Sequence, residues 1–345
     1  MNNAHEMGSA RSGVTVGGHL LAGRAILAPM SGITDAPFRR LVHDFGATLV
    51  VSEMVASEEL VHDRPEAVLR TVGHGVSPNV IQLAGCEAKW MREGARRAVD
   101  AGADIVDINM GCPSRRVTNG WSGSALMRDL DNACRLIEAT VTAVDVPVTL
   151  KMRLGWDRAS LNAPELATRA VGLGVRMVTV HARTRCDFYK GPVDWDAVRH
   201  VVDAVDVPVV VNGDIRGLEE ARTALARSGA DAVMIGRGAC GRPWIVGAIA
   251  AALESGGEAD ERPPVDLGGL VARHYDEILS HYGTGLGVRV ARKHLGWYLD
   301  HAPASCAGGS NPSAWRARLL TEDDPEIVAA LLPAAFAGAE LMDAA

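Results

Sequence analysis

A chain of 345 residues, 48% of them hydrophobic, can bury one large core and still leave residues for a second, smaller domain. Its formal net charge of −7 excludes a protein that holds nucleic acid through a general positive field, so any RNA-binding surface must be local. No stretch approaches the roughly 18 consecutive apolar residues of a membrane span, and six scattered cysteines without a Cys-x-x-Cys pair favour neither disulfides nor a metal site.

The N-terminal segment shows no sign of a targeting sequence. Residues 1–20 have no apolar stretch behind a basic start, which argues against a secretory signal peptide. We therefore expect residues 1–20 to be a flexible lead-in. We also expect a cytoplasmic monomer that binds neither a membrane nor a metal ion.

Eight short apolar runs follow one another along the chain, separated by amphipathic segments rich in Ala, Arg and Glu. The runs are residues 25–31, 48–54, 79–85, 104–111, 147–153, 177–183, 208–214 and 232–238. Near-continuous apolar strands that alternate with helices predict a parallel sheet, and eight such units predict a (β/α)8 TIM barrel over residues 21–255. A doubly wound open sheet is the competing architecture, but no Gly-x-Gly-x-x-Gly turn follows the first strand.

The strand–helix alternation stops near residue 255. Residues 256–265 are rich in Gly, Pro and acidic side chains, which is typical of a linker, and only helical periodicity follows them. We expect a small helical bundle over residues 266–345. Within it, Trp297 and Tyr298 are expected to be core residues.

Polar side chains stand at the C-terminal ends of the predicted strands, which converge on one mouth in a barrel. The last two of these ends combine glycines with a cation, and such loops commonly bind phosphate through backbone N–H groups. The candidates for a phosphate site are the backbones of Gly213, Gly236 and Gly238, to which Arg237 can add a charge. The alternative is that the glycines only make tight turns.

Three further strand ends offer groups for an electron-rich ring. Lys151 could hold negative charge on the ring of a reduced flavin, unless it pairs with Glu53 or Asp107. Gln82 can both donate and accept a hydrogen bond at a ring edge, and His181 suits a phosphate or a base edge. A phosphate site beside such a ring site predicts flavin mononucleotide, FMN.

One cysteine stands on a turn directly after a strand, in the stretch DINMGCPSRRV. At neutral pH an ordinary thiol is mostly protonated, so Cys112 could act as a general acid. Arg115 and Arg116 would instead favour the thiolate, and with it a nucleophile. No histidine partner is evident, so we favour the acid. A buried, inert cysteine is the remaining interpretation.

These motifs resemble those of the tRNA-dihydrouridine synthase family, and most closely its bacterial type-B branch. The matching pieces run in family order over nearly the whole chain: LAPMSGITDAPFRRLV, IQLAG, DINMGCPSRRV, GSALMRD, VTLKMRLGWD, TVHARTRCDFYKGPVDW, VVVNGDI, VMIGRGACGRPWI and HYGTGLGVRVARKHLGWYL. The resemblance implies an FMN enzyme that reduces the C5–C6 double bond of a D-loop uridine in tRNA, with NADPH as the electron source.

The resemblance also implies a role for each matching residue. Hydride would pass from the reduced flavin to uracil C6, and Cys112 would deliver a proton to C5. The residues that would border or bind the flavin are Pro29, Met30, Ser31, Gln82, Lys151, His181, Asn212, Gly213, Asp214, Gly236 and Arg237.

A uracil must leave its stack to reach a barrel floor, so the chain should contact both the extruded base and the RNA backbone. Asn109 is the candidate for the base. The candidates for the backbone phosphates are Arg115, Arg116, Arg183 and Arg185 at the barrel mouth, and Arg289, Arg292 and Lys293 on one face of a C-terminal helix.

Two other functions remain open at this point. One is a small-molecule flavin oxidoreductase of the same barrel class, resembling dihydroorotate dehydrogenases, which would not need the basic C-terminal helix. The other is a catalytically silent RNA-binding protein, against which the combination of Cys112, Lys151 and His181 argues.

Overall fold

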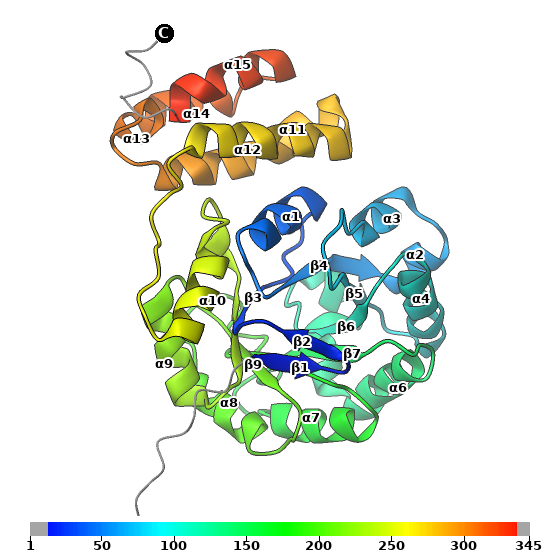
Figure 1. Cartoon of the computed structure of the whole chain (residues 1–345). Helices are drawn as coiled ribbons and strands as arrows, with labels where there is room; N and C mark the ends of the chain where they lie inside the picture. Colours follow the sequence, from blue (N-terminus) through cyan, green and yellow to red (C-terminus); the bar gives the residue numbers. More distant parts are fainter. Residues whose placement is uncertain (1–12, 337–345) are drawn as a thin grey trace, which may run out of the picture.

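The barrel that the sequence predicts is present in the computed structural model, which describes residues 13–336 (Figure 1). Within that range eight parallel strands close into a ring, in which the last strand pairs with the first. The strands are β3 (Ala25–Leu27), β4 (Leu49–Ala56), β5 (Val80–Ala84), β6 (Ile105–Met110), β7 (Val148–Arg153), β8 (Val178–His181), β9 (Val209–Asn212) and β10 (Ala232–Ile235). Each lies in one of the eight predicted runs, or overlaps it, so the predicted fold class is confirmed.

Helices follow the strands and cover the outside of the ring. They are α1 (Ala36–Asp44), α2 (Ser57–Val61), α3 (Pro65–Thr71), α4 (Ala88–Asp100), α5 (Arg115–Thr118), α6 (Leu130–Val141), α7 (Ala163–Gly172), α8 (Trp195–Val202), α9 (Leu218–Ser228) and α10 (Ile245–Ser255), with 3-10 turns η1 (Gly123–Arg128) and η2 (Arg237–Ala239). Aspartates fix several helix starts: Asp35, Asp129 and Asp194 each accept a hydrogen bond from a first-turn N–H. Local sequence therefore sets where these helices begin.

The predicted flexible lead-in is wrong for its second half. Residues 13–20 do not form a free segment, because β1 (Val14–Val16) and β2 (His19–Leu21) make an antiparallel hairpin. The side chains of Val14, Val16 and Leu21 are buried against apolar residues of the barrel strands, at the end where the strands begin. Each strand of the hairpin has only three residues, and an alternation of apolar and polar residues over so short a stretch does not identify a strand in the sequence. Residues 1–12 lie outside the described residues.

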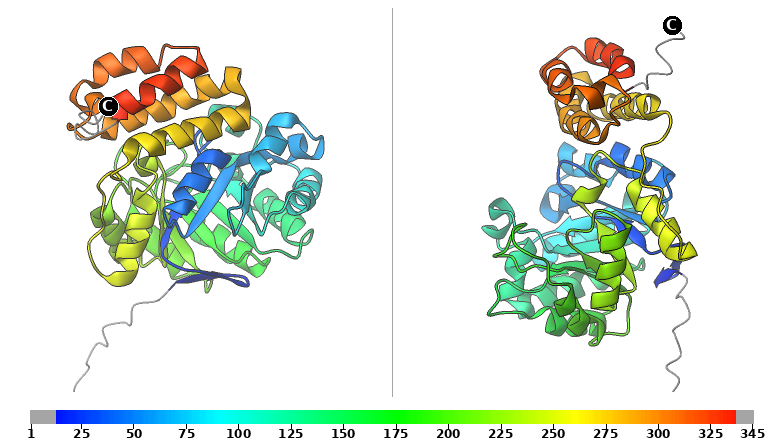
Figure 2. Two further views of the ribbon diagram at one scale, coloured as in Figure 1. Left: turned by 45° about the horizontal axis from the view of Figure 1, so that its top comes forward. Right: turned by 90° about the vertical axis from the view of Figure 1, so that its left-hand side faces the viewer.

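Five helices of the described chain form a layer beside the barrel (Figure 2). They are α11 (Leu267–Tyr282), α12 (Thr284–His301), α13 (Ala307–Ser310), α14 (Pro312–Leu319) and α15 (Pro325–Phe336). They share an apolar core of their own, in which Tyr298 is buried as predicted, whereas Trp297 is only half-buried. We propose that barrel and helical layer are two domains divided at residues 256–265. No helix of the described residues is long and apolar enough to cross a membrane.

A buried polar cluster joins the two parts. Asp35 at the start of α1 accepts a hydrogen bond from the Tyr282 hydroxyl of α11, and His274 and His294 lie beside it with ligand atoms up to 4.8 Å apart. Zinc ligands at 2.0–2.1 Å from the ion lie only about 3.4 Å from one another, whereas the hydrogen-bond partners of one buried water lie about 4.6 Å apart. We therefore interpret the cluster as a polar contact between the domains.

Candidate active site

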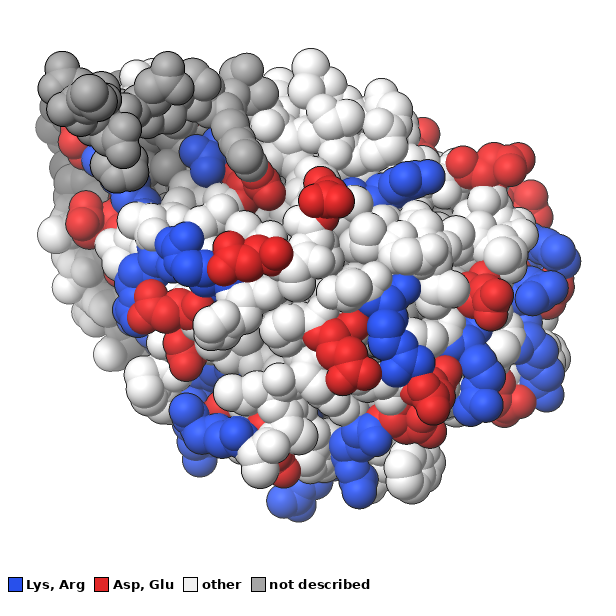
Figure 3. Space-filling model, turned by 90° about the horizontal axis from the view of Figure 1, so that it is seen from below, with Lys and Arg blue, Asp and Glu red and all other residues white. Residues whose placement is uncertain are grey.

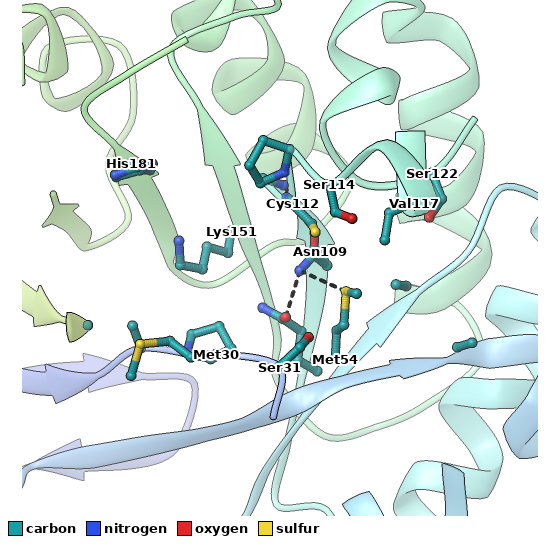
Figure 4. A pocket seen from close by; sticks show the side chains of 18 of the residues that line it. Met30, Ser31, Met54, Asn109, Cys112, Ser114, Val117, Ser122, Lys151 and His181 are labelled. Carbon is teal, nitrogen blue, oxygen red and sulfur yellow. Dashed lines mark hydrogen bonds between the residues drawn. The ribbon is translucent and has the colours of Figure 1, made fainter. Parts of the chain in front are cut away.

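A cavity of about 1020 Å³ opens at the carboxyl ends of the barrel strands (Figure 4). It brings together most of the residues that the sequence nominated, from seven separate strand ends and the loops that follow them. Those that line it are Pro29, Met30, Ser31, Gln82, Asn109, Cys112, Arg116, Lys151, His181, Asn212, Gly213, Asp214, Gly236 and Arg237. The nominated residues that do not line it are Arg115, Arg183, Arg185, Arg289, Arg292 and Lys293.

The Cys112 turn is held rigidly over this cavity. The Asn109 side-chain oxygen accepts hydrogen bonds from the N–H groups of Gly111, at 3.2 Å, and Cys112, at 3.0 Å. The Cys112 carbonyl accepts two more, from the Ser124 N–H at 3.1 Å and the Ser124 hydroxyl at 2.7 Å. The Arg153 Nε donates to the Gly111 carbonyl at 2.8 Å. These contacts fix the direction in which the thiol points.

The Cys112 thiol is protonated at neutral pH. Burial raises its pKa above that of an ordinary cysteine, against the opposing effect of the Ser114 N–H and the charges of Arg153 and Lys151. Arg115 and Arg116, which the sequence suggested would favour a thiolate, are exposed on α5 and contribute no comparable effect. A protonated, oriented thiol can donate a proton.

Lys151 brings a buried positive charge to the same cavity. Its Nζ donates to the Asn212 side-chain oxygen at 3.1 Å, and within the described residues no carboxylate lies in ion-pair contact with it. Burial first, and then the nearby charge of Arg153, lower the pKa of Lys151 to about 8. The structural alternative of a pair with Glu53 or Asp107 is therefore wrong. An anionic group in the cavity would supply the missing counter-charge.

Gln82 is oriented by two short hydrogen bonds. Its Nε2 donates to Asp107 at 2.6 Å, and its Oε1 accepts from the Asn109 amide at 2.7 Å. Gln82 keeps one amide N–H and an oxygen lone pair for a ring edge. Asn109, by contrast, spends its amide on Gln82 and its oxygen on the Cys112 turn. Asn109 therefore positions Cys112, and its expected contact with the extruded base stays a prediction, since Asn109 also lines the cavity.

The loops after β9 and β10 leave a set of backbone donors free. Within the described chain the N–H groups of Gly213, Asp214, Gly236 and Arg237 have no hydrogen-bond acceptor. Gly213 has a φ of +131°, and a Cβ there would lie 3.1 Å from the His181 ring. Such converging donors in positive-φ backbone form an anion-binding concavity. This geometry fits a phosphate.

The Gly213 backbone yields a direct prediction. Gly213→Ala forces an L residue into a φ that costs about 1–3 kcal/mol, and the new Cβ pushes against His181. The purified variant should therefore carry less of the expected flavin per chain than the wild type. Gly172→Ala is the control, because a Cβ at Gly172 meets no atom within 4 Å. Absorbance of bound flavin measures both, and equal flavin content in the two variants would contradict the assigned phosphate site.

Arg183, in the phosphate region, is held by contacts within the protein. Arg183 is 2% exposed and pairs with Asp214, and it also donates to the carbonyls of Lys190 and Gly191. The expectation that Arg183 anchors an RNA phosphate is therefore wrong, because its guanidinium is buried and fully paired. His181 is neutral, since burial first and then the surrounding Arg and Lys charges lower its pKa well below the usual value.

The nominated cations of α12 do not share one face. Arg292 pairs with Asp323, and Lys293 is turned toward the barrel, where Asp35 and Glu53 lie near it. Consecutive helix residues are about 100° apart, so these two side chains diverge. Arg289 is exposed and has no carboxylate partner in the described chain. The contact of Arg289 with RNA stays a prediction.

The charge distribution agrees with a local RNA contact. On the face turned away from the helical layer, acidic and basic side chains alternate, and the described residues form no extended basic patch there (Figure 3). This pattern matches the negative net charge.

Sequence reasoning missed Tyr189, and it noted Arg153 at a strand end without assigning it a role. Tyr189 lines the cavity, and the guanidinium carbons of Arg153 and Arg237 lie 5.4 and 5.5 Å from its ring centre. Arg153 also links the Cys112 turn to the loop of Thr184 and Phe188 by donating to their carbonyls. The only sequence signal for Tyr189 was an aromatic residue in the loop after a strand. Loop residues follow no helical or strand periodicity, so the sequence could not predict that Tyr189 faces the cavity.

The fold and the site define a (β/α)8-barrel enzyme whose chemistry takes place where the strands end. A sequence model described as dihydrouridine synthase matches residues 26–320. The chain therefore belongs to the dihydrouridine synthase family, and the resemblance is confirmed.

The individual relatives agree with this assignment. The chain is 53% identical to a "Probable tRNA-dihydrouridine synthase" of Rhizobium leguminosarum bv. phaseoli, over 90% of this chain and 94% of that one. It is 43% identical to tRNA-dihydrouridine synthase B of Pseudomonas aeruginosa, over 85% and 88% of the two chains.

Solved structures show the same fold at low identity. Histamine dehydrogenase from Rhizobium sp. 4-9 has a TM-score of 0.53 at 16% identity, covering 76% of this chain and 50% of that one. An old yellow enzyme homologue from Zymomonas mobilis has a TM-score of 0.50 at 15% identity, covering 68% and 90%. These likenesses establish the barrel.

Proposed function

We propose that this protein is a tRNA-dihydrouridine synthase that reduces the C5–C6 double bond of a D-loop uridine in tRNA, with FMN as cofactor and NADPH as reductant. One observation carries the proposal: a protonated thiol, Cys112, is fixed at the mouth of the same cavity that holds the buried Lys151 charge and the free backbone donors. Acid, ring site and phosphate site thus share one opening.

The residues present fit FMN at both of its ends. The free N–H groups of Gly213, Asp214, Gly236 and Arg237 would hold the phosphate, because they have no other acceptor in the described chain. Lys151 and Gln82 would bind the polar edge of the ring, while Met30 and Ser31 would border it. When bound there, reduced FMN supplies the hydride that uracil C6 receives.

The chain supplies the proton. Hydride addition at C6 leaves negative charge at C5 and O4, and Cys112 would give its thiol proton to C5, so that two hydrogens are added and the thiolate is reprotonated from solvent. The Asn109 and Ser124 contacts keep the thiol in place for this transfer. The raised pKa that burial gives Cys112 keeps the proton on the thiol at neutral pH.

RNA would be held around the mouth. Arg115 and Arg116 on α5 and Arg289 on α12 are exposed and have no carboxylate partner in the described chain, so they can contact phosphates. Uridines of single-stranded loops are splayed and can enter such a cavity. We also expect the protein to act as a monomer in the cytoplasm.

The test is mass spectrometry of nucleosides from tRNA of cells with and without the gene. We expect dihydrouridine to be lost at one D-loop position on deletion, and to be restored by the wild-type gene but not by Cys112→Ala. Unchanged dihydrouridine in a strain that has no second synthase would overturn the proposal and favour a small-molecule flavin oxidoreductase.

A further inference from the structure

An exposed tryptophan stands at the rim of the cavity on an unusual backbone. Trp121 lies between α5 and η1, is 61% exposed, and has a φ of +57°. Left-handed backbone is rare for a bulky residue and usually marks strain or function. Its neighbours Gly120 and Ser122 line the cavity. The ring is therefore displayed at the edge of the active site.

The turn that carries Trp121 is fastened on both sides. The Trp121 N–H donates to the Thr118 carbonyl at 3.1 Å, and the Ser122 hydroxyl donates to the Gly85 carbonyl at 3.1 Å. Two residues further on, Ser124 holds the Cys112 carbonyl. The tryptophan and the thiol consequently belong to one hydrogen-bonded unit, so a group bound by the ring has a fixed relation to Cys112.

Trp121 is the outer member of a ladder in which aromatic rings and guanidinium groups alternate. Arg128 lies 5.6 Å from the Trp121 ring centre and 4.9 Å from that of Trp156. Arg185 lies 4.6 Å from Trp156 and 4.6 Å from Phe188. The inner rings are at least half-buried, whereas Trp121 ends the ladder in solvent. The stacked guanidiniums limit the motion of the ring and add positive charge beside it.

We propose that Trp121 is a stacking platform for an unpaired nucleobase of the RNA substrate, next to the uridine that enters the cavity. An aromatic ring beside arginines is the combination by which proteins hold single-stranded RNA, since every base has a π-face and every nucleotide a phosphate. The inference rests on the proposed action on tRNA. It assigns substrate positioning to a residue that does not touch the reacting atoms.

The variants that test it are Trp121→Ala, Trp121→Phe and Trp121→Gly. Loss of one stacked base should weaken binding of a fluorescein-labelled, unmodified tRNA transcript about tenfold, measured by anisotropy. Trp121→Phe should recover most of the affinity. Leu20→Ala is the control, because Leu20 is 73% exposed on the β1–β2 hairpin at the opposite end of the barrel, and it should bind like the wild type.

Two further readouts separate stacking from other roles. The slope of log affinity against log salt should be unchanged in Trp121→Ala but smaller in Arg116→Ala, because only the second removes a phosphate contact. Trp121→Gly suits the left-handed backbone, so its thermal unfolding midpoint should equal or exceed that of the wild type although its RNA affinity falls. A ring needed only for folding would instead lower the midpoint.

The outcomes separate this inference from the proposed function. Wild-type affinity in both Trp121→Ala and Trp121→Gly would overturn the stacking role even if the wild-type enzyme reduces tRNA uridine. Weaker binding in these variants would support it even if turnover proved to act on another base. A wild-type protein that does not bind the transcript would overturn both.

Discussion

Cys112→Ala should lower the rate of uridine reduction by roughly 10² to 10⁴, the usual contribution of a positioned general acid. The thiol is the group at the cavity mouth that burial keeps protonated and that the Asn109 and Ser124 contacts hold in place. Binding of FMN and its reduction by NADPH should remain near the wild-type level, because Cys112 provides no group to the phosphate or ring sites. Single-turnover kinetics with tRNA, and separately with NADPH, measure the two half-reactions.

Cys86→Ala is the matched control for this variant. Cys86 also lines the cavity and also has a pKa raised by burial, but it lies on the loop after β5, away from the Cys112 turn. The Cys86→Ala variant should reduce tRNA at close to the wild-type rate. Equal rates for Cys112→Ala and Cys86→Ala would remove the acid role. In the wild type, the rate on tRNA should fall as the pH rises through the raised pKa of Cys112.

Lys151→Met should slow flavin reduction by roughly 10² to 10³, which is typical when one preorganised electrostatic partner of a developing charge is removed. Lys151 is buried without a carboxylate contact in the described chain, so its charge is available to the ring. Stopped-flow reduction by NADPH and the flavin content of the purified protein check the expectation. A wild-type rate with full flavin content would contradict the ring assignment.

Lys151→Met should also leave the flavin-free protein as stable as the wild type, or more so. Burial lowers the pKa of Lys151 to about 8, which means that the charged form is costly in the empty cavity. Replacing it by an apolar side chain of similar length removes that cost. The thermal unfolding midpoints of the two flavin-free proteins test this expectation. A much lower midpoint for Lys151→Met than for the wild type would contradict it.

The barrel could be predicted because its signal is repeated along the chain. The strands are buried on both faces, so each appears as a continuous apolar run such as residues 79–85, and β5 there is buried at every position. The strand ends then place Cys112 and Lys151 at one mouth by topology alone. Such inference needs no knowledge of side-chain contacts.

Side-chain partners were the part that the sequence could not supply. Arg183 and Arg185 look alike in the sequence, yet Arg183 is buried against Asp214 and Arg185 is stacked on Trp156. Likewise Asn109 was assigned to the substrate because it stands at a strand end, but its hydrogen bonds go to the Cys112 turn. Periodicity in the sequence predicts whether a side chain faces the core, the cavity or solvent. Which side chain or backbone group it contacts is seen only in the folded structure.

The β1–β2 hairpin has a kinetic consequence. It packs on the end where the barrel strands begin, whereas the cavity in the described chain is lined by the other ends of the strands, the loops that follow them and residues of α2, α3, α4 and α5. We therefore expect the proposed reductant, NADPH, and tRNA to use the same entrance in turn, so that oxidised nicotinamide departs before the polynucleotide binds. Initial velocities measured at several concentrations of both substrates should therefore give parallel double-reciprocal lines, the signature of a ping-pong sequence.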